Sequence, residues 1–349
     1  TIVPICKRLY KMSETHSNSD SYSIPDLSKS PELVFLDTDA GHDDAMAMLL
    51  AGVSPSLKLL GISTVAGNQT VEKTTLNTLR MLTACNICDI PVVKGAHKPL
   101  CRPTVVCEEI HGESGLDGTT FPPLKCSAIE NRKAIDVMFE IISAQEKGSV
   151  NMVTIGPLTN LANLVNIYPE VLPYFKRIVL MGGAIGPGNM GGVSEWNIQV
   201  DPEAAHVVFS LGKTTDIPIV MIPLEVTHET LVTRSILSSI DSFQSKFGKL
   251  LHELLTFFSK SYHDVFHFDD PPLHDPNTLA FLIDPSLYSL TKYNVEIECS
   301  SSLTAGCTVV DLFNLSGRPK NVFVAEKVNV SGFWSIMLDA FRRANTNNP

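Results

Sequence analysis

Four aspartates crowded into eight residues constrain this chain more than any other feature of its sequence. An apolar run at 33–36 precedes them and a segment rich in Ala, Met and Leu at 45–51 follows them; the four are Asp37, Asp39, Asp43 and Asp44. The apolar run suits a buried strand and the later segment favours a helix, so the acids lie at a strand-to-helix turn. A helix cap accounts for one of them, with Asp43 as the candidate, but four repel one another unless a cation intervenes. Such hard oxygen ligands suit Ca²⁺ or Mg²⁺.

The order of strand, polar turn and helix recurs along the chain. Apolar segments predict further strands at residues 57–65, 91–93, 150–155, 177–181, 217–223 and 321–325. Composition and helical spacing predict helices at residues 71–85, 129–147, 161–167 and 330–343, with another beginning at Asp201. This alternation predicts an α/β fold with an open, doubly wound, mainly parallel sheet. We also expect a helical lid within residues 236–268 and a small C-terminal hairpin within residues 295–310.

Composition divides the 349 residues into three parts. Residues 13–30 are rich in Ser, Asp and Asn and hold few large apolar side chains, so we expect residues 1–30 to form a disordered leader. Residues 31–343 then make one domain, which is large enough to bury a substantial core. Residues 344–349 are expected to form a short tail.

Charge and hydropathy argue against two classes of partner. A net charge of −10 provides no basic surface for nucleic acid. No apolar run reaches the roughly 18 residues that a membrane span requires.

The eight cysteines are irregularly spaced in a chain large enough to be stable without disulfides, which predicts reduced thiols in a cytoplasmic protein. We interpret the isolated pair Cys85 and Cys88 as buried thiols rather than a zinc or redox site.

Polar side chains recur where the predicted strands end. Besides the aspartate cluster, they are Asn68, His111, Asn189, Glu195, Asn197, His274 and Asp275. In a doubly wound sheet these strand ends share one edge, where ligands usually bind. Carboxylates for a cation, amides for hydroxyl groups and a histidine for proton transfer together indicate hydrolysis of a neutral, polyhydroxylated substrate.

Seven motifs follow one another along nearly the whole domain. They are DTDAGHDDAMA at 37–47, VAGN at 65–68, HGESGL at 111–116, GPLTN at 156–160, MGGAIGPGN at 181–189, SEWNIQVDPEAA at 194–205 and HDPNTLAFLIDP at 274–285. In this order they resemble the inosine-uridine preferring nucleoside hydrolase family. The resemblance implies hydrolysis of the N-glycosidic bond of ribonucleosides to ribose and free base. We therefore expect a small-molecule nucleoside as substrate and a homodimer or homotetramer as the assembly.

The resemblance also implies roles for individual residues. A Ca²⁺ site falls on Asp39, Asp44, Asp275 and the backbone carbonyl of Ile155. Asp39 is also the general base that activates a Ca-bound water, and His274 protonates the leaving base. Ribose contacts fall on Asp43, Asn68, Asn189, Glu195 and Asn197. His111 contacts the base, and Asp37 supports the ligands from behind. A histidine at position 274 is similar to members that accept uridine and inosine, which favours a broad or pyrimidine-preferring enzyme.

The first motif departs from the family's usual D-x-D-P-G at two positions. Ala40 replaces the proline, which loosens the turn but removes no ligand. His42 stands where an aliphatic residue is common, and we expect it to be a solvent-facing loop histidine because such turns are polar.

Two other functions stay open at this point. A Mg²⁺-dependent phosphohydrolase of the haloacid dehalogenase type also places Asp37 and Asp39 after a first strand, but that pattern requires Thr or Val at position 41, where this chain has Gly41. A non-catalytic nucleoside-binding protein would keep the cation and lack turnover, and the presence of Asp39 and His274 argues against it. Assays for released ribose and released phosphate separate the three.

Overall fold

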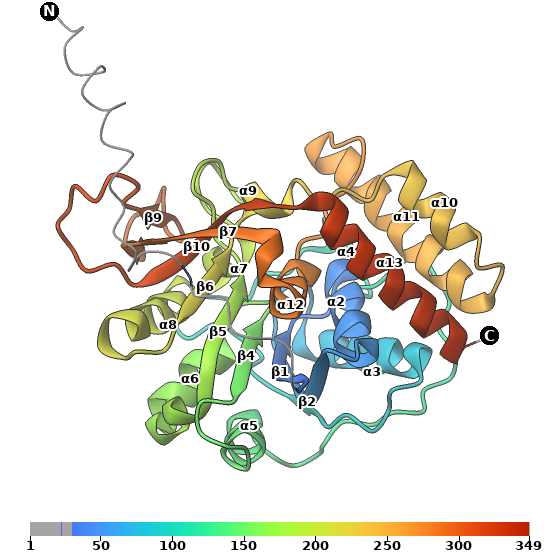
Figure 1. Cartoon of the computed structure of the whole chain (residues 1–349), viewed down its shortest axis with the longest axis horizontal. Helices are drawn as coiled ribbons and strands as arrows, with labels where there is room; N and C mark the ends of the chain where they lie inside the picture. Colours follow the sequence, from blue (N-terminus) through green and yellow to red (C-terminus); the bar gives the residue numbers. More distant parts are fainter. Residues whose placement is uncertain (1–21, 23–29, 349) are drawn as a thin grey trace, which may run out of the picture.

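Eight strands form one sheet in the order β3-β2-β1-β4-β5-β6-β10-β7 (Figure 1). The computed structural model describes Tyr22 and residues 30–348, so nearly all of the predicted leader lies outside the described residues. The strands are β1 Glu32–Thr38, β2 Leu57–Thr64, β3 Val92–Lys94, β4 Val150–Thr154, β5 Phe175–Met181, β6 Ile219–Ile222, β7 Tyr288–Tyr293 and β10 Val322–Val328. All neighbouring pairs are parallel except β10 with β7. The predicted doubly wound, mainly parallel sheet is confirmed.

The strand order reverses in the middle of the sheet, between β1 and β4. From β1 the chain builds outward through β2 and β3, and it then returns to β4 and builds the other way through β5 and β6. Asp37 near the end of β1 pairs in register with Thr154 at the end of β4. Ligands of doubly wound proteins bind at the carboxyl ends of strands at such a reversal, so this position sets where a site is expected.

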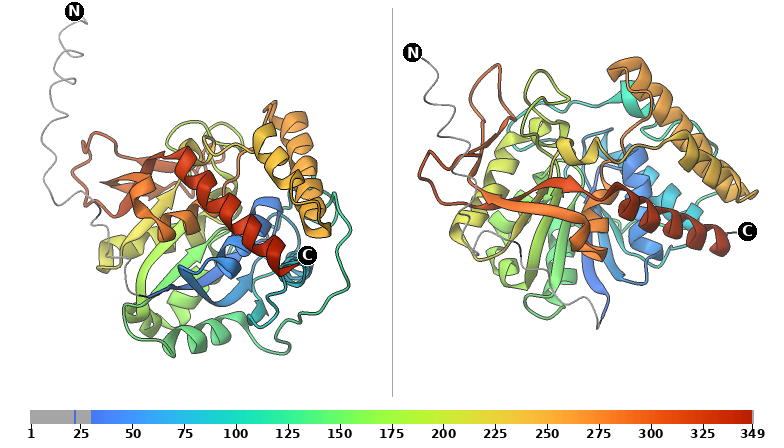
Figure 2. Two further views of the ribbon diagram at one scale, coloured as in Figure 1. Left: turned by 45° about the vertical axis from the view of Figure 1, so that its right-hand side comes forward. Right: turned by 45° about the horizontal axis from the view of Figure 1, so that its top comes forward.

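Helices cover both faces of the sheet (Figure 2). On one face lie α2 His42–Val53, α3 Val71–Cys85, α12 Pro276–Ile283 and α13 Val330–Asn347, and on the other lie α5 Ala134–Ser143, α6 Thr159–Ile167 and α8 Pro202–Thr214. Val34 and Leu36 of β1 belong to the core of the first face and Phe35 to that of the second, because successive strand residues point to opposite sides. Helix α13 ends four residues beyond the predicted domain boundary at Arg343.

Two further helices, α10 Arg234–Asp241 and α11 Lys246–Phe266, occupy the segment predicted as a helical lid. The Ser245 hydroxyl caps α11 by accepting a hydrogen bond from the backbone N–H of Gly248 at 2.9 Å. The buried face of α11 includes Phe247, Leu251, Leu254 and Phe258, spaced three or four residues apart. This apolar stripe holds α11 against the body of the protein, where α11 contacts α2 and the short helix α4 Glu108–His111.

The remaining elements are short. They are α7 Trp196–Val200, α9 Leu224–Thr227, the 3₁₀ helices η1 Pro169–Tyr174 and η2 Pro285–Leu287, and the hairpin strands β8 Val295–Ile297 and β9 Thr308–Val310. The predicted C-terminal hairpin is therefore confirmed. Strand β7 was not predicted, because only Tyr288 of this edge strand is buried and its sequence lacks the apolar run of a central strand.

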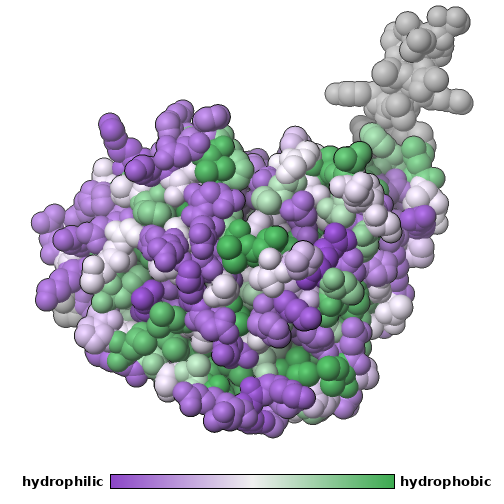
Figure 3. Space-filling model, turned by 180° about the vertical axis from the view of Figure 1, so that it is seen from behind, coloured by the Kyte–Doolittle hydropathy of each residue, from purple (hydrophilic) through white to green (hydrophobic). Residues whose placement is uncertain are grey.

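In the described part of the chain, no helix is both long enough and apolar enough to cross a bilayer. The face shown in Figure 3 carries its hydrophobic residues in small groups scattered among hydrophilic ones.

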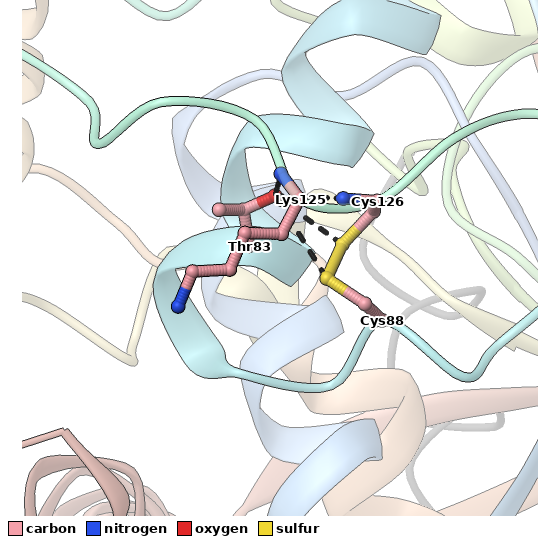
Figure 4. The surroundings of a disulfide bond; sticks show 4 residues. All are labelled: Thr83, Cys88, Lys125 and Cys126. Carbon is pink, nitrogen blue, oxygen red and sulfur yellow. Dashed lines mark hydrogen bonds between the residues drawn. A yellow bond between two sulfur atoms is a disulfide. The ribbon is translucent and has the colours of Figure 1, made fainter.

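A disulfide joins Cys88, just after α3, to Cys126, in the long loop before α5 (Figure 4). The Thr83 hydroxyl donates to the Cys126 sulfur at 3.2 Å and accepts from the backbone N–H of Lys125 at 3.2 Å. The prediction of reduced thiols is therefore wrong for this pair, whereas Cys85 is a buried free thiol as expected. Sequence spacing did not reveal the pairing because its partners are 38 residues apart.

Replacing Cys88 with Ser should lower the free energy of unfolding by about 4 kcal/mol, because the bond closes a loop of 38 residues whose entropy the unfolded chain would regain. Urea unfolding without reductant measures this loss. Cys101→Ser, which removes an exposed free thiol, is the matched control and should unfold like the wild type. Equal stability of Cys88→Ser and the wild type under oxidising conditions would contradict the pairing.

Candidate active site

One pocket at the carboxyl edge of the sheet gathers most of the residues proposed from the sequence. Its lining includes Asp43, Asn68, His111, Ile155, Asn189, Glu195, Asn197, His274 and Asp275. They come from the start of α2, from the segments that follow β2, β4 and β5, from α4 after β3, and from the residues just before α12. Asp39 and Asp44 lie beside it and are fully buried. The pocket therefore stands at the strand reversal between β1 and β4, where this fold type binds ligands.

Three carboxyl groups meet at the base of this pocket. Ligand oxygens of Asp43, Asp44 and Asp275 all lie within 4.8 Å of one another. Burial, together with repulsion from Asp44, raises the pKa of Asp43 to about 7. Burial also raises the pKa of Asp44, and burial with repulsion from Asp43 raises that of Asp275 well above its usual range. An all-oxygen cluster of this kind is the donor set that a hard divalent cation prefers.

Asp44 is held in place by three donors. Its Oδ1 accepts from the Thr38 hydroxyl at 2.5 Å, and its Oδ2 accepts from the backbone N–H of Gly41 at 2.8 Å and from Nδ2 of Asn68 at 3.1 Å. The bond to Gly41 caps α2, so the capping aspartate is Asp44 and not Asp43 as expected. The cap leaves Asp43, which is one residue earlier, free to face the pocket.

Asp39 is enclosed by two glycines. A Cβ atom at Gly67 would lie 2.2 Å from Asp39 Oδ2 and one at Gly156 would lie 2.7 Å from Oδ1, so only glycine lets these loops close on the carboxyl group. Oδ2 accepts from the backbone N–H of Asn68 at 2.7 Å, whereas buried Oδ1 has no partner among the described residues. Burial and repulsion from Asp44 raise the pKa of Asp39 well above its ordinary value. A buried carboxyl oxygen without a donor is a position that a cation or a water satisfies.

Asp37 lies deeper than the other aspartates and is absent from the pocket lining. Its Oδ1 accepts from the Ser63 hydroxyl at 2.5 Å and from Nδ2 of Asn160 at 2.7 Å. Burial raises the pKa of Asp37 to about 7. Because its donors belong to β2 and α6, Asp37 joins neighbouring elements beneath the cluster, which is the arrangement a supporting residue requires.

Three of the proposed ribose contacts, Asn189, Glu195 and Asn197, form a connected group after β5. The carboxyl group of Glu195 caps α7 and accepts hydrogen bonds from three backbone N–H groups. One of these donors is the backbone N–H of Asn197, at 2.9 Å. Burial raises the pKa of Glu195 to about 7. Nδ2 of Asn197 donates to the carbonyl of Ile155 at 3.1 Å, and Oδ1 of Asn189 accepts from the backbone N–H of Trp196 at 2.9 Å. The first of these bonds places the Asn197 amide beside the carbonyl proposed as a cation ligand.

The expectation that His42 faces solvent is wrong, because its side chain is fully buried. Its ring stacks on those of Phe257 and Phe258, with centroids 5.2 Å and 5.4 Å away. Its Nε2 lies 2.8 Å from the carbonyl oxygen of Asp117, and its Nδ1 lies 3.1 Å from Nδ1 of His111. Burial lowers the pKa of His42 to about 4. The local sequence suggested a polar turn. It could not reveal the burial, because the hydrogen-bond partners His111 and Asp117 are 69 and 75 residues away in the chain.

His274 has a hydrogen-bond partner on each ring nitrogen. Its Nδ1 lies 2.7 Å from the hydroxyl of Thr227, and its Nε2 lies 2.6 Å from the hydroxyl of Tyr262 on α11. Burial, with repulsion from His228, lowers the pKa of His274 well below its usual range. His274 is therefore neutral near pH 7, and the Tyr262 hydroxyl is the group with which it exchanges a hydrogen bond inside the pocket.

Sequence reasoning missed most of the apolar wall of the pocket. Tyr262 lines it from α11, in the segment predicted as a helical lid, and the members that were missed are Phe258 and Phe266 of the same helix with Cys107, Ile110, Met181, Met190 and Trp196. The signal available was the spacing of the three rings at four-residue intervals, which places them on one face of a helix.

Comparisons with known proteins identify the family of this chain. The family described as inosine-uridine preferring nucleoside hydrolase matches residues 34–335. A "Probable ribonucleoside hydrolase" of Dictyostelium discoideum is 47% identical over 323 residues, covering 88% of this chain and 93% of that protein. The "Pyrimidine-specific ribonucleoside hydrolase RihA" of Escherichia coli O127:H6 is 41% identical over 310 residues, covering 88% of this chain and 98% of that protein.

A solved structure extends the comparison to three dimensions. The "Purine-Preferring Ribonucleoside Hydrolase from Gardnerella vaginalis" matches with a TM-score of 0.83 at 30% identity, covering 90% of this chain and 100% of that one. The chain belongs to the inosine-uridine preferring nucleoside hydrolase family. It is a ribonucleoside hydrolase, an enzyme acting on N-glycosyl compounds, and the phosphohydrolase and binding-protein alternatives have no support.

The raised pKa values predict how stability depends on pH without divalent cations. Asp43 and Glu195 have folded-state pKa values of about 7, above their unfolded values near 4. Their contribution to stability is therefore complete below about pH 4 and is lost as pH rises through about 7. In the presence of a chelator, the melting temperature should fall between about pH 5 and pH 8.

Asp43→Asn removes one ionisable group, so the melting temperature of this variant should fall less with rising pH than that of the wild type. The exposed, ion-paired Asp339 on α13 provides the control. The melting temperature of Asp339→Asn should fall with pH as much as that of the wild type. A melting temperature that is constant or increases over this range would show that the buried carboxyls are compensated in some other way.

Proposed function

We propose that the protein hydrolyses pyrimidine ribonucleosides, uridine above all, and that its aspartate cluster and its His274–Tyr262 pair act on opposite sides of the scissile bond. The observation that carries this proposal is their convergence on one pocket. Asp43 and Asp275 of the aspartate cluster line this pocket together with His274 and Tyr262. A buried pocket with oxygen ligands on one wall and aromatic rings on the other suits a ribose and a flat base.

We also propose that the cation is Ca²⁺, held by Asp39, Asp44, Asp275 and the carbonyl of Ile155. The unpartnered Oδ1 of Asp39 and the close approach of Asp44 to Asp275 support a cation here. The donors are all oxygens, as Ca²⁺ prefers. When bound, such an ion supplies Lewis acidity, which lowers the pKa of a bound water and attracts ribose hydroxyl groups.

Asp39 is the proposed general base. Its Oδ1 is free of protein donors, so it can accept the proton of a water that attacks the anomeric carbon. The Asn68 backbone N–H on Oδ2 fixes the orientation of the carboxyl group during this transfer. Bond cleavage gives the ribose positive charge, as in the related hydrolysis of O-glycosides, and the carboxylates of Asp43 and Glu195 stabilise it. The side-chain amides of Asn68, Asn189 and Asn197 are positioned to hold the ribose hydroxyls.

The His274–Tyr262 pair is the proposed source of the proton for the leaving base. The 2.6 Å bond between Nε2 and the Tyr262 hydroxyl lets the pair share a proton, while the Thr227 hydroxyl at 2.7 Å fixes the ring from the other side. Tyr262 carries its hydroxyl on α11 and lines the same pocket as Asp43 and Asp275, so the proton is delivered inside this pocket.

Removing either member of the pair should slow reactions that need a protonated base. His274→Ala should reduce kcat on uridine by about 10²- to 10⁴-fold, which is the usual value of general-acid assistance. Tyr262→Phe should also reduce kcat on uridine. Activity on p-nitrophenyl riboside should fall much less, because its leaving group needs little protonation. Equal losses on the two substrates would remove the pair from this role.

The choice of base follows from the relatives rather than from the pocket alone. The pyrimidine-specific relative of Escherichia coli is 41% identical, whereas the purine-preferring one of Gardnerella vaginalis is 30% identical. We therefore propose that uridine exceeds inosine as a substrate, although inosine is expected to be accepted.

A panel of nucleosides tests this function. Released sugar, which is ribose from uridine and inosine and 2-deoxyribose from 2′-deoxyuridine, should be greatest with uridine, smaller with inosine and smallest with 2′-deoxyuridine, which lacks a hydroxyl that the amides and the cation would contact. Treatment with a chelator should abolish ribose release, and added Ca²⁺ should restore it. Undiminished activity after exhaustive chelation, or a preference for deoxyuridine, would contradict the proposed sugar and cation contacts.

Assembly and compartment complete the proposal. A homodimer or homotetramer stays a prediction, which the molar mass in solution tests. A cytoplasmic location also stays a prediction, and the disulfide between Cys88 and Cys126 argues against it, because cytosolic thiols are normally kept reduced.

A further inference from the structure

His42 and His111 form a pair of buried histidines at the edge of the pocket. The Nδ1 atoms of the two rings are 3.1 Å apart, and Nε2 of His42 is 2.8 Å from the Asp117 carbonyl. Only His111 of the two lines the pocket. None of the hydrogen bonds within residues 30–348 uses Nε2 of His111, so this nitrogen is available to a substrate.

The contacts of His42 determine which nitrogen of His111 carries the proton. A carbonyl oxygen only accepts hydrogen bonds, so Nε2 of His42 must be protonated to bond with Asp117. In a neutral ring Nδ1 of His42 then has a lone pair, and it must accept from Nδ1–H of His111. A neutral His111 protonated at Nδ1 has its free lone pair on Nε2.

The opposite arrangement requires a positively charged His42. His42 would then donate from Nδ1 to His111, whose Nδ1 would also accept from the His42 backbone N–H, now 3.3 Å away. Such a charge would be fully buried in the first turn of α2, where the helix dipole opposes it. The carboxyl group of Asp117 attracts such a charge, but burial opposes the charge more strongly, and that carboxyl already accepts from the Ser114 hydroxyl and the Glu113 backbone N–H. The neutral arrangement gives up only the long 3.3 Å bond from the His42 backbone N–H to Nδ1 of His111, and it is therefore favoured.

Two features hold the pair in this geometry. A Cβ atom at Gly41 would lie 2.6 Å from Nδ1 of His111, so the absence of a side chain there allows His111 to approach the start of α2. The Asp117 carboxyl accepts from the Ser114 hydroxyl at 2.5 Å, which fixes the turn that presents the Asp117 carbonyl to His42.

We propose that His42 is a positioning residue that holds His111 as its Nδ1–H tautomer, so that Nε2 meets the substrate as a hydrogen-bond acceptor. The group it recognises is an N–H or O–H donor of the nucleoside. This inference rests on the proposed function for its kinetic consequence, but the tautomer of His111 is a property of the free protein and is measured without substrate.

Nitrogen NMR of the full chain, labelled with ¹⁵N-histidine, tests the tautomer directly. His111→Gln identifies the signals of His111 by their disappearance. In the wild type, Nδ1 of His111 should have the shift of a protonated nitrogen and Nε2 that of an unprotonated one. The reverse pattern, or a doubly protonated His42, would overturn the proposal whether or not the protein hydrolyses uridine.

Two substitutions separate positioning from packing. His42→Phe keeps a ring against Phe257 but has no nitrogen, so His111 should become a mixture of tautomers, and kcat/KM for uridine should fall roughly 10-fold, mainly through KM. His42→Gln can accept from His111 and donate to Asp117, so it should retain the wild-type tautomer and remain within about 3-fold of the wild-type kcat/KM.

The exposed His263 on α11 is the control, because His263→Phe should change neither measurement. An unchanged His111 tautomer in His42→Phe would show that His42 has a packing role only. If His42→Phe does not fold, the wild-type and His42→Gln spectra still decide the matter. Loss of all hydrolysis in the wild type, with the expected NMR pattern intact, would reject the proposed function and leave the tautomer assignment standing.

Discussion

The burial of four carboxyl groups at the strand reversal is the constraint on which the rest of the site depends. Asp39, Asp43, Asp44 and Asp275 are all at least nine-tenths buried, and burial raises the pKa of each. Buried acids are tolerated only with donors or a compensating charge. The fold supplies donors to Asp44 from three directions but leaves Oδ1 of Asp39 without one. That imbalance is the physical reason to expect a cation and a reactive water at this point of the sheet.

The wall of the pocket that His111 and the aromatic residues of α11 form depends on a different constraint. A long irregular segment of the chain has to be held in place there. The segment between β3 and α5 carries His111 and contains little regular structure. The Cys126 sulfur ties it to the end of α3, and the Thr119 hydroxyl donates to Glu253 of α11 at 2.6 Å. Because α11 also carries Tyr262, these ties hold the histidine and the aromatic wall in one frame. A dry, aromatic wall keeps the histidines neutral and strengthens their hydrogen bonds.

The sequence predicted the parts that depend on local patterns. Alternating strands and helices, and polar residues at strand ends, were sufficient to place Asp39, Asn68 and His274 at one edge. What it could not predict depends on contacts between distant residues. The pairing of Cys88 with Cys126 and the burial of His42 against the loop of His111 have no local signature. Strand β7 was missed for a related reason, because an edge strand needs few apolar residues and therefore lacks the pattern of a buried one.

The most direct measurement of the central claim is a crystal structure of the protein grown with Ca²⁺ and ribose. The arrangement of the carboxyl groups predicts one ion at about 2.3 to 2.6 Å from oxygens of Asp39, Asp44, Asp275 and the Ile155 carbonyl, with the sugar hydroxyls on the same ion. The Oδ1 atom of Asp39 should then no longer be without a partner. Absence of the ion at saturating Ca²⁺, or an ion bound by Asp43, Asp44 and Asp275 without Asp39, would contradict the assignment of Asp39 as cation ligand and general base.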